Sequence, residues 1–213
     1  MKSLIIFSIS LVVGFLLVTG YAYWNHQRTF ALVPTPVITT KFSLANAPQD
    51  SLKGEIASVS GSVNWLSRVA KKPVLLTSKH SIQQGEELGT GKNGNAIVTI
   101  QHTTAVLLSA NSHINFIQIL PINMVIAQDK GSVIYENVGS NALTVNTLDL
   151  ITAINRSWVQ ISVDPVAKSV TVTVQKGSIT VGYEDLQNTS NVVTVDAGKE
   201  FVFDDTSRIG TVF

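Results

Sequence analysis

The sequence predicts an all-β domain of many short strands, solenoid-like or a sandwich, preceded by one N-terminal transmembrane helix. Val, Ile and Thr alternate with polar residues in segments such as 96–100, 143–147 and 169–174, and a period of two places β-branched side chains on one face of a strand. Turn signals such as Lys92-Asn93-Gly94 and Lys176-Gly177 separate these segments, which recur about every 8–12 residues. No segment after residue 53 shows the apolar stripe of a helix.

The first element is an uncharged segment of 21 residues, from Leu4 to Trp24, which ends in an aromatic cluster. A helix of this length spans roughly 30 Å, about the thickness of the hydrocarbon core of a bilayer, and aromatic residues are enriched at the membrane interface. We therefore expect residues 4–24 to anchor the chain in the lipid bilayer of the inner cell membrane. Residues 1–3 would form a short cytoplasmic tail, with the C-terminal domain outside the cytoplasm.

The same segment also fits a cleavable signal peptide. Lys2 supplies a basic n-region, and Gly20 and Ala22 are small residues of the kind found at a cleavage site. Cleavage there would release a secreted protein. Both alternatives place the rest of the chain outside the cytoplasm.

Residues 25–53 are expected to form a stalk, and residues 54–213 the β domain. Three prolines, Pro34, Pro36 and Pro48, disfavour a helix in the stalk. An alternative for residues 37–42 is an edge strand that pairs with the domain.

Three triplets in the domain begin with Gly-Ser and open a strand: Gly61-Ser62-Val63, Gly131-Ser132-Val133 and Gly177-Ser178-Ile179. They indicate either the irregular repeat of a solenoid or simply strands that start after tight turns.

The composition excludes several classes of function. Only 14% of the residues are charged, the formal net charge is +1, and there is no Cys. A chain without Cys has no disulfide framework, thiol nucleophile or thiolate-bound metal. A balanced charge provides no basic field for a nucleic acid, so we expect no nucleic-acid partner.

Three further patterns lack the context that their chemistry needs. Residues 89–94 match G-x-G-x-x-G, but a predicted strand follows them, so a hairpin connection is a better explanation than a phosphate site before a helix. His102 and His113 could meet across neighbouring strands, yet no His has metal-ligand spacing. Two pairs of acidic residues are adjacent in the sequence, Glu86-Glu87 and Asp204-Asp205. The two carboxylates of each pair would point to opposite faces of a strand, so we expect them to be solvated turn charges. The sequence thus predicts no enzyme, and no catalytic, metal-binding or cofactor-binding residue.

Trp65 and Trp158 are the candidate partner-contact residues. Trp158 points to the face opposite Val159 and Ile161, so it lies either on a wetter face or in a sheet that is covered on both sides. We expect both Trp side chains to pack in the core, and partner contact is the alternative. A cleft that holds Trp158 beside a carboxylate would favour saccharide binding.

The order of these motifs resembles the periplasmic domain of the FecR family of bacterial single-pass membrane proteins, over about residues 54–204. Each motif is short, and the resemblance rests on their order and spacing. The similar segments are Gly61–Val63, Gly85–Thr90, Gly94–Ile100, Lys130–Val133, Val145–Thr147, Val172–Ile179 and Val195–Lys199.

The resemblance implies a mainly β domain outside the cytoplasm on a single membrane span. Two departures limit it. His102-Thr103-Thr104 replaces the family's Asp-Gly-Ser turn, and only three residues precede the membrane segment, too few for the cytoplasmic domain that holds a sigma factor. We therefore expect a non-enzymatic interaction or structural module with a protein or envelope-polymer partner. The alternatives are a regulator that couples an outside signal to a separate cytoplasmic sigma or anti-sigma partner, and a secreted carbohydrate-binding module.

Overall fold

The computed structural model describes residues 19–21, 23 and 46–213. The chain divides into two units, Met1–Phe42 and Ser43–Phe213, and the described residues of the first unit are helical. No helix within the described residues has the length and apolar character needed to cross a membrane. Most of the predicted span 4–24, and all of the candidate edge strand 37–42, lie outside the described residues.

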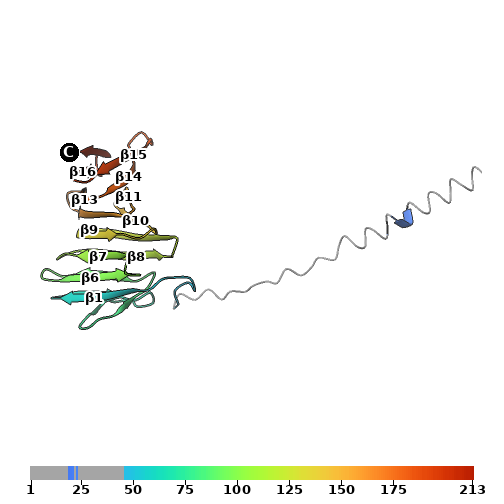
Figure 1. Ribbon diagram of the computed structural model, residues 1–213, viewed down its shortest axis with the longest axis horizontal. Helices are drawn as coiled ribbons and strands as arrows, with labels where there is room; N and C mark the ends of the chain where they lie inside the picture. Colours follow the sequence, from blue (N-terminus) through green and yellow to red (C-terminus); the bar gives the residue numbers. More distant parts are fainter. Residues whose placement is uncertain (1–18, 22, 24–45) are drawn as a thin grey trace, which may run out of the picture. The chain divides into compact units, whose positions relative to one another are not determined.

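The second unit is an all-β domain, which confirms the all-β part of the predicted fold class. Its strands follow one another along a stack, from β1 in cyan to β16 in red (Figure 1). The end of the predicted stalk contacts this domain, because the Leu52 N–H donates to the Ile119 carbonyl at 2.8 Å. The described residues form seventeen strands: β1 (Gly54–Ser60), β2 (Val63–Leu66), β3 (Val74–Leu75), β4 (Ser81–Ile82), β5 (Glu87–Thr90), β6 (Asn95–Ile100), β7 (Thr104–Leu108), β8 (His113–Ile119), β9 (Asn123–Asn137), β10 (Ala142–Thr147), β11 (Leu150–Ile154), β12 (Ser157–Asp164), β13 (Ser169–Lys176), β14 (Ser178–Glu184), β15 (Ser190–Asp196), β16 (Glu200–Asp204) and β17 (Ile209–Val212).

The strands pair into two sheets that share the long strand β9. Sheet A has the order β4-β1-β6-β7-β9-β12-β13-β16-β17. Sheet B has the order β3-β2-β5-β8-β9-β10-β11-β14-β15. Residues 123–130 of β9 pair in sheet B, and residues 131–137 pair in sheet A. Neighbouring strands are antiparallel except β9 and β10, which are parallel.

Glycines with positive φ lie at corners where the chain passes from one sheet to the other. Gly61 (φ 65°), Gly131 (φ 83°) and Gly177 (φ 80°) each separate a sheet A segment from a sheet B segment. Glycine adopts this conformation without the clash of a Cβ atom. A Cβ at Gly177 would lie 2.9 Å from the Arg156 carbonyl oxygen, so this corner packs directly on the neighbouring one. The Gly-Ser triplets are therefore recurrent corners of the stack.

The G-x-G-x-x-G pattern at residues 89–94 forms another corner, between β5 and β6. The prediction of a hairpin connection is wrong here, because β5 pairs with β2 and β8 while β6 pairs with β1 and β7. The turn joins two different sheets.

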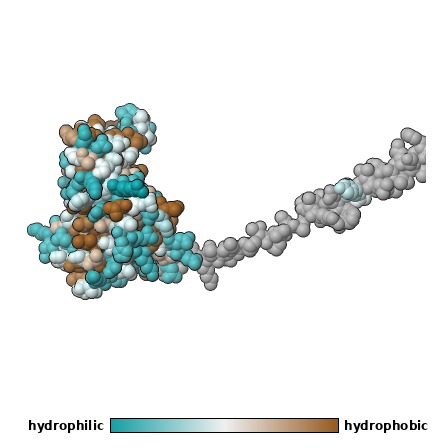
Figure 2. Space-filling model, in the orientation of Figure 1, coloured by the Kyte–Doolittle hydropathy of each residue, from teal (hydrophilic) through white to brown (hydrophobic). Residues whose placement is uncertain are grey.

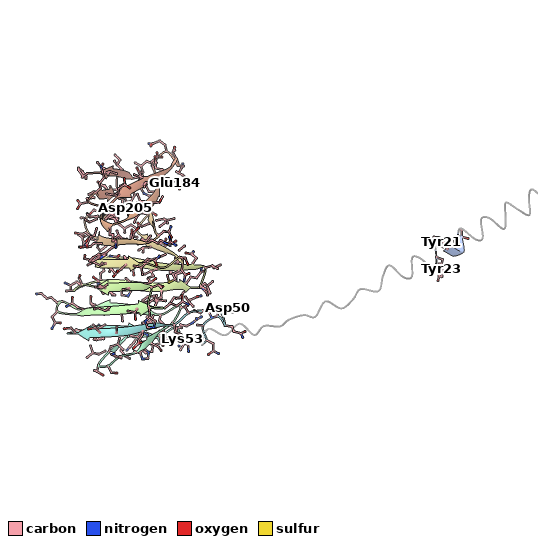
Figure 3. All side chains as sticks on the ribbon, in the orientation of Figure 1. Tyr21, Tyr23, Asp50, Lys53, Glu184 and Asp205 are labelled. Atoms are coloured by element: carbon pink, nitrogen blue, oxygen red, sulfur yellow. The ribbon has the colours of Figure 1, made fainter. Side chains whose placement is uncertain are left out.

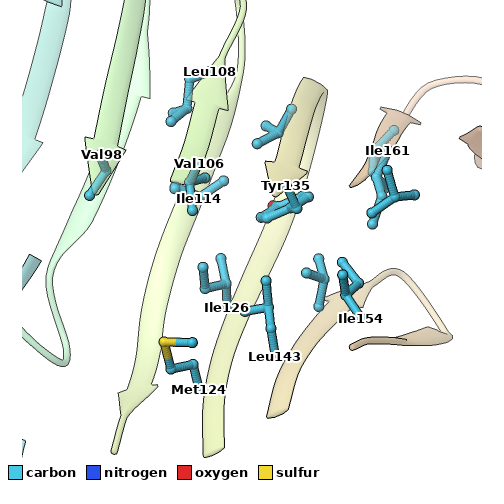
Figure 4. Close-up of a cluster of buried hydrophobic side chains, with 14 of the residues drawn as sticks. Val98, Val106, Leu108, Ile114, Met124, Ile126, Tyr135, Leu143, Ile154 and Ile161 are labelled. Carbon is cyan, nitrogen blue, oxygen red and sulfur yellow. The ribbon is translucent and has the colours of Figure 1, made fainter. Parts of the chain in front are cut away.

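One hydrophobic core lies between the inner faces of the two sheets. Figure 4 shows Val98 and Val106 of sheet A in this core, together with Met124 and Ile126 of sheet B. The buried phenol of Tyr135 donates a hydrogen bond to Gln128 Oε1 at 3.0 Å. The alternation in the sequence thus produces two sheets, each with one buried face and one outer face.

Three hairpin turns at β12–β13, β14–β15 and β16–β17 begin with an aspartate whose carboxylate accepts backbone N–H groups. These bonds stabilise the ionised form and lower the pKa of each carboxyl. The donors are Ala167 and Val166 for Asp164, Thr189 and Gln187 for Asp185, and Ser207 and Thr206 for Asp204.

Replacing Asp164, Asp185 and Asp204 together by Asn should lower the urea midpoint at pH 7. A lowered pKa in the folded state contributes stability that is present above the unfolded value of 3.8 and is lost as the pH falls through the folded value. The difference from wild type should therefore shrink as the pH falls below 3.8. Urea unfolding at several pH values measures this, and a difference independent of pH would contradict it.

Candidate functional site

Trp65 lies in β2 at the edge of the core. Its side chain packs against the core, and its indole N–H donates to Glu86 Oε2 at 3.0 Å. Its ring centroid lies 4.2 Å from that of His80. The expected core role is thus found for Trp65.

Glu86 is buried, so the prediction that it is a solvated turn charge is wrong. Its Oε2 atom accepts both the Trp65 indole and the Gln83 N–H, the latter at 2.9 Å. These two donors compensate for the water that the carboxylate loses. Glu87, on the opposite face of β5, is partly exposed.

Trp158 lies on the outer face of sheet A and is 39% exposed. The expectation of core packing is wrong for this residue, because the described residues place no further layer over it. On adjacent strands, Glu136 of β9 and Lys176 of β13 stand directly opposite Trp158. These three residues are far apart in sequence and come together only through the order of the strands.

We call the depression around this residue the Trp158 cleft, and its volume is about 340 Å³. It combines an aromatic ring, a carboxylate and two cationic side chains. Among the described residues, no ion pair forms between the charged groups of the cleft. The lining residues are Glu136, Val138, Arg156, Ser157, Trp158 and Lys176.

Arg156 occupies the corner between β11 and β12 with a φ of 51°. This left-handed conformation costs an L-residue about 1–2 kcal/mol relative to glycine. Glycine is the residue at the corners Gly61, Gly131 and Gly177. The chain thus holds a long cation at a position whose backbone favours glycine, as it also does at Lys168 and Arg208.

A second depression of about 270 Å³ lies on sheet B beside His113. His113 Nδ1 is 2.7 Å from Asp129 Oδ2, and its Nε2 is 3.3 Å from Glu87 Oε2. Both ring nitrogens donate together only in the protonated imidazolium form. No local sequence pattern signals this bridge, because Glu87, His113 and Asp129 belong to three different strands, β5, β8 and β9.

His102 lies in the turn between β6 and β7 of sheet A, whereas His113 begins β8 of sheet B. No contact joins these two side chains in the described part of the chain. The described residues contain no group of three His, Cys, Asp or Glu side chains arranged for a metal ion.

The carboxyl end of the stack leaves a long strand edge open. Within the described residues β15 pairs only with β14, whereas β13 in sheet A pairs on both sides. Val192 of β15 and Ile151 of β11 are 73% and 54% exposed, and both lie opposite Gly182 of β14. Figure 2 shows apolar side chains among hydrophilic ones at this end.

A cluster of charged side chains links the β10–β11 and β16–β17 turns at the same end. Arg208 forms ion pairs with Asp149 and, at 3.9 Å, with Asp205. Burial raises the pKa of Asp205, and so does Asp149 by hydrogen bonding and charge repulsion, while Arg208 opposes both effects. Asp205 and Glu184 lie at the end of the domain opposite to Asp50 and Lys53 (Figure 3). The sequence predicts Asp204 and Asp205 to be solvated turn charges. Asp204 is exposed, but Asp205 is partly buried.

Comparison with solved structures finds a similar fold in a protein from Parabacteroides distasonis ATCC 8503. That protein is described as a putative anti-sigma factor and has been crystallised at 2.50 Å and 1.65 Å resolution. Each superposition has a TM-score of 0.51 with 13% identity, and covers 60% of this chain and 58% of the other. The likeness therefore spans less than two thirds of that protein and shows the fold. No family model and no curated protein matches the sequence.

Proposed function

We propose that this chain is a membrane-anchored, non-enzymatic interaction module of FecR type, with its β domain outside the cytoplasm. Three observations support the proposal. They are the uncharged apolar segment 4–24, the order of FecR-like motifs over residues 54–204, and the fold shared with the Parabacteroides protein. The lipid bilayer is the partner of the anchor, and a protein is the partner of the domain.

The observation that carries the interaction role is the open edge of β15. This strand has seven residues, Ser190–Asp196, and contains neither Lys nor Pro, which are residues that protect natural edges from pairing. At the other end of the stack, β3 and β4 have only two residues each, and β1, which β4 covers only at Gly54 and Glu55, carries a β-bulge between Ile56 and Ser58. Short edge strands and β-bulges both protect an edge from pairing. An extended segment of a partner can add to the β15 edge through main-chain hydrogen bonds.

Site-specific photocrosslinking in intact cells tests this proposal. A photoreactive residue at Thr194, exposed on β15, should give a discrete crosslinked product. The matched position is Thr171 on β13, a strand that is paired on both sides. Val192→Lys should reduce the Thr194 product at least severalfold, because a lysine on an edge opposes pairing.

Equal products at Thr194 and Thr171, or a Thr194 product unchanged by Val192→Lys, would overturn the interaction role. The anchor is tested separately on the same cells. The protein should remain in the membrane fraction after alkaline extraction, and external protease should digest the domain in spheroplasts. Recovery in the soluble fraction would contradict the anchor and favour cleavage after Gly20 or Ala22.

A second candidate function is a regulator that transmits an outside signal to a separate cytoplasmic sigma or anti-sigma partner. The fold shared with a protein described in those terms favours it. Removal of residues 54–213 should then change the transcripts of one promoter class, as RNA sequencing would show. Unchanged transcripts would leave only the interaction role.

A further inference from the structure

The groups that line the Trp158 cleft differ from those of an ordinary exposed sheet. Trp158 presents an exposed aromatic face, while Val138, itself 60% exposed, provides a further apolar wall. The volume of about 340 Å³ lies at the lower end of the range for small-molecule sites. A ring-shaped ligand with one apolar face therefore fits this cleft better than an extended peptide.

The charges of the cleft select the chemistry of that ligand. Arg156 and Lys176 contribute two positive charges and Glu136 one negative charge, so the site has a net charge of +1. An Arg guanidinium binds a carboxylate through two parallel hydrogen bonds. An ionised Glu136 is an acceptor only, so a ligand that also carries O–H or N–H donors complements it.

We propose that the Trp158 cleft binds an acidic sugar unit of a polysaccharide, with its pyranose face on Trp158. The sugar carboxylate binds Arg156 and Lys176, and its hydroxyl groups donate to Glu136. An acidic peptide supplies a carboxylate and N–H donors, but it lacks the apolar ring face that packs on Trp158. The cleft belongs to the outer face of sheet A, whereas the β15 edge belongs to sheet B. A negative result for sugar binding therefore leaves the proposed partner pairing at β15 untouched, and the reverse also holds.

The backbone conformation at Arg156 allows the side chain to be removed without added strain. Arg156→Gly removes the guanidinium at a φ of 51° that glycine adopts freely, so its urea midpoint should be unchanged or higher. Lys168→Gly is the matched control. Lys168 is also exposed, also has a φ of 51°, and lies in the β12–β13 turn outside the cleft.

The experiment measures binding of fluorescently labelled trigalacturonate to the full chain by fluorescence anisotropy. The comparison ligands are its fully methyl-esterified form, which keeps the sugar but not the charge, and pentaglutamate. Wild type should bind trigalacturonate about tenfold or more tightly than either comparison ligand, since tenfold corresponds to one lost charge-assisted interaction of about 1.4 kcal/mol. Trp158→Ala should weaken this binding about tenfold, Arg156→Gly should lose the preference for the acid, and Lys168→Gly should behave as wild type.

Equal affinity for the methyl ester would overturn the acidic selectivity. Tighter binding of pentaglutamate would assign the cleft to an acidic peptide instead. Absence of binding at millimolar trigalacturonate, or an equal loss in Arg156→Gly and Lys168→Gly, would overturn the site itself.

Discussion

Gly131→Ala is expected to lower the free energy of unfolding by roughly 3 kcal/mol, from two additive causes. Gly131 has a φ of 83°, in which a Cβ atom is unfavourable. That Cβ would also lie 2.5 Å from Ser112 Cα and 2.7 Å from the Asn111 carbonyl oxygen. Backbone atoms cannot rotate away as a side chain can, so the β7–β8 corner must separate from the bend of β9.

The separation also breaks a pair of hydrogen bonds between the two corners. Ser112 Oγ donates to the Ser132 carbonyl at 2.9 Å and accepts the Ser132 N–H at 3.0 Å. β9 contributes to both sheets at this point, so the substitution should weaken strand pairing in both sheets. Urea unfolding followed by Trp fluorescence measures the loss.

Gly198→Ala is the matched control for this prediction. Gly198 has nearly the same φ, 82°, but a Cβ there meets no atom within 4 Å. It should cost only about 1 kcal/mol, the conformational part alone. Equal losses at the two positions would show that packing between corners contributes nothing.

The local parts of the fold follow from the sequence, while the pairing of distant strands does not. Alternation in residues 169–174 predicts β13, and Val170, Val172 and Val174 are indeed buried. The bend of β9 is different, because residues 123–137 form one strand that changes sheets at Gly131. Alternation reports which side chains share a face, but it carries no information on which strand lies alongside.

The Trp158 cleft shows the same limit at a site. The period of two places Trp158 opposite Val159 and Ile161, and that assignment is correct. Whether the opposite face is covered depends on layers that only the folded domain defines. Glu136 and Lys176 meet Trp158 through strand register, so no local spacing could have predicted them.

The burial of Glu86 could not be predicted from the sequence for a related reason. An adjacent acidic pair is usually solvated, because a buried carboxylate loses its hydration. Here the compensating donors are Gln83, three residues away, and Trp65, which reaches Glu86 across the β2–β5 pairing. The first partner is visible in the sequence as a local turn, but the second depends on tertiary structure.

Tyr135→Phe is expected to lower the free energy of unfolding by about 1–2 kcal/mol at pH 7, because Gln128 Oε1 loses its buried donor. The Gln128 side chain also donates to the Gly131 carbonyl at 2.8 Å and the Ile161 carbonyl at 3.0 Å. The phenol therefore helps to fix the side chain that bridges the bend of β9 and strand β12. Unfolding in urea at neutral pH measures this first effect.

The stability deficit caused by the same substitution should shrink in alkali. Burial raises the pKa of Tyr135 well above its usual value of 10.0. The folded state keeps the proton while the unfolded chain releases it, so the stability that this group contributes is complete below pH 10 and is lost as the pH rises toward the folded value. The loss reaches about 1.4 kcal/mol for each pH unit in that window. Tyr135→Phe has no such proton, so the difference in free energy of unfolding between it and wild type should shrink above pH 10. Urea unfolding of both proteins at several alkaline pH values measures this. A constant difference would show that the core does not hold the phenol protonated.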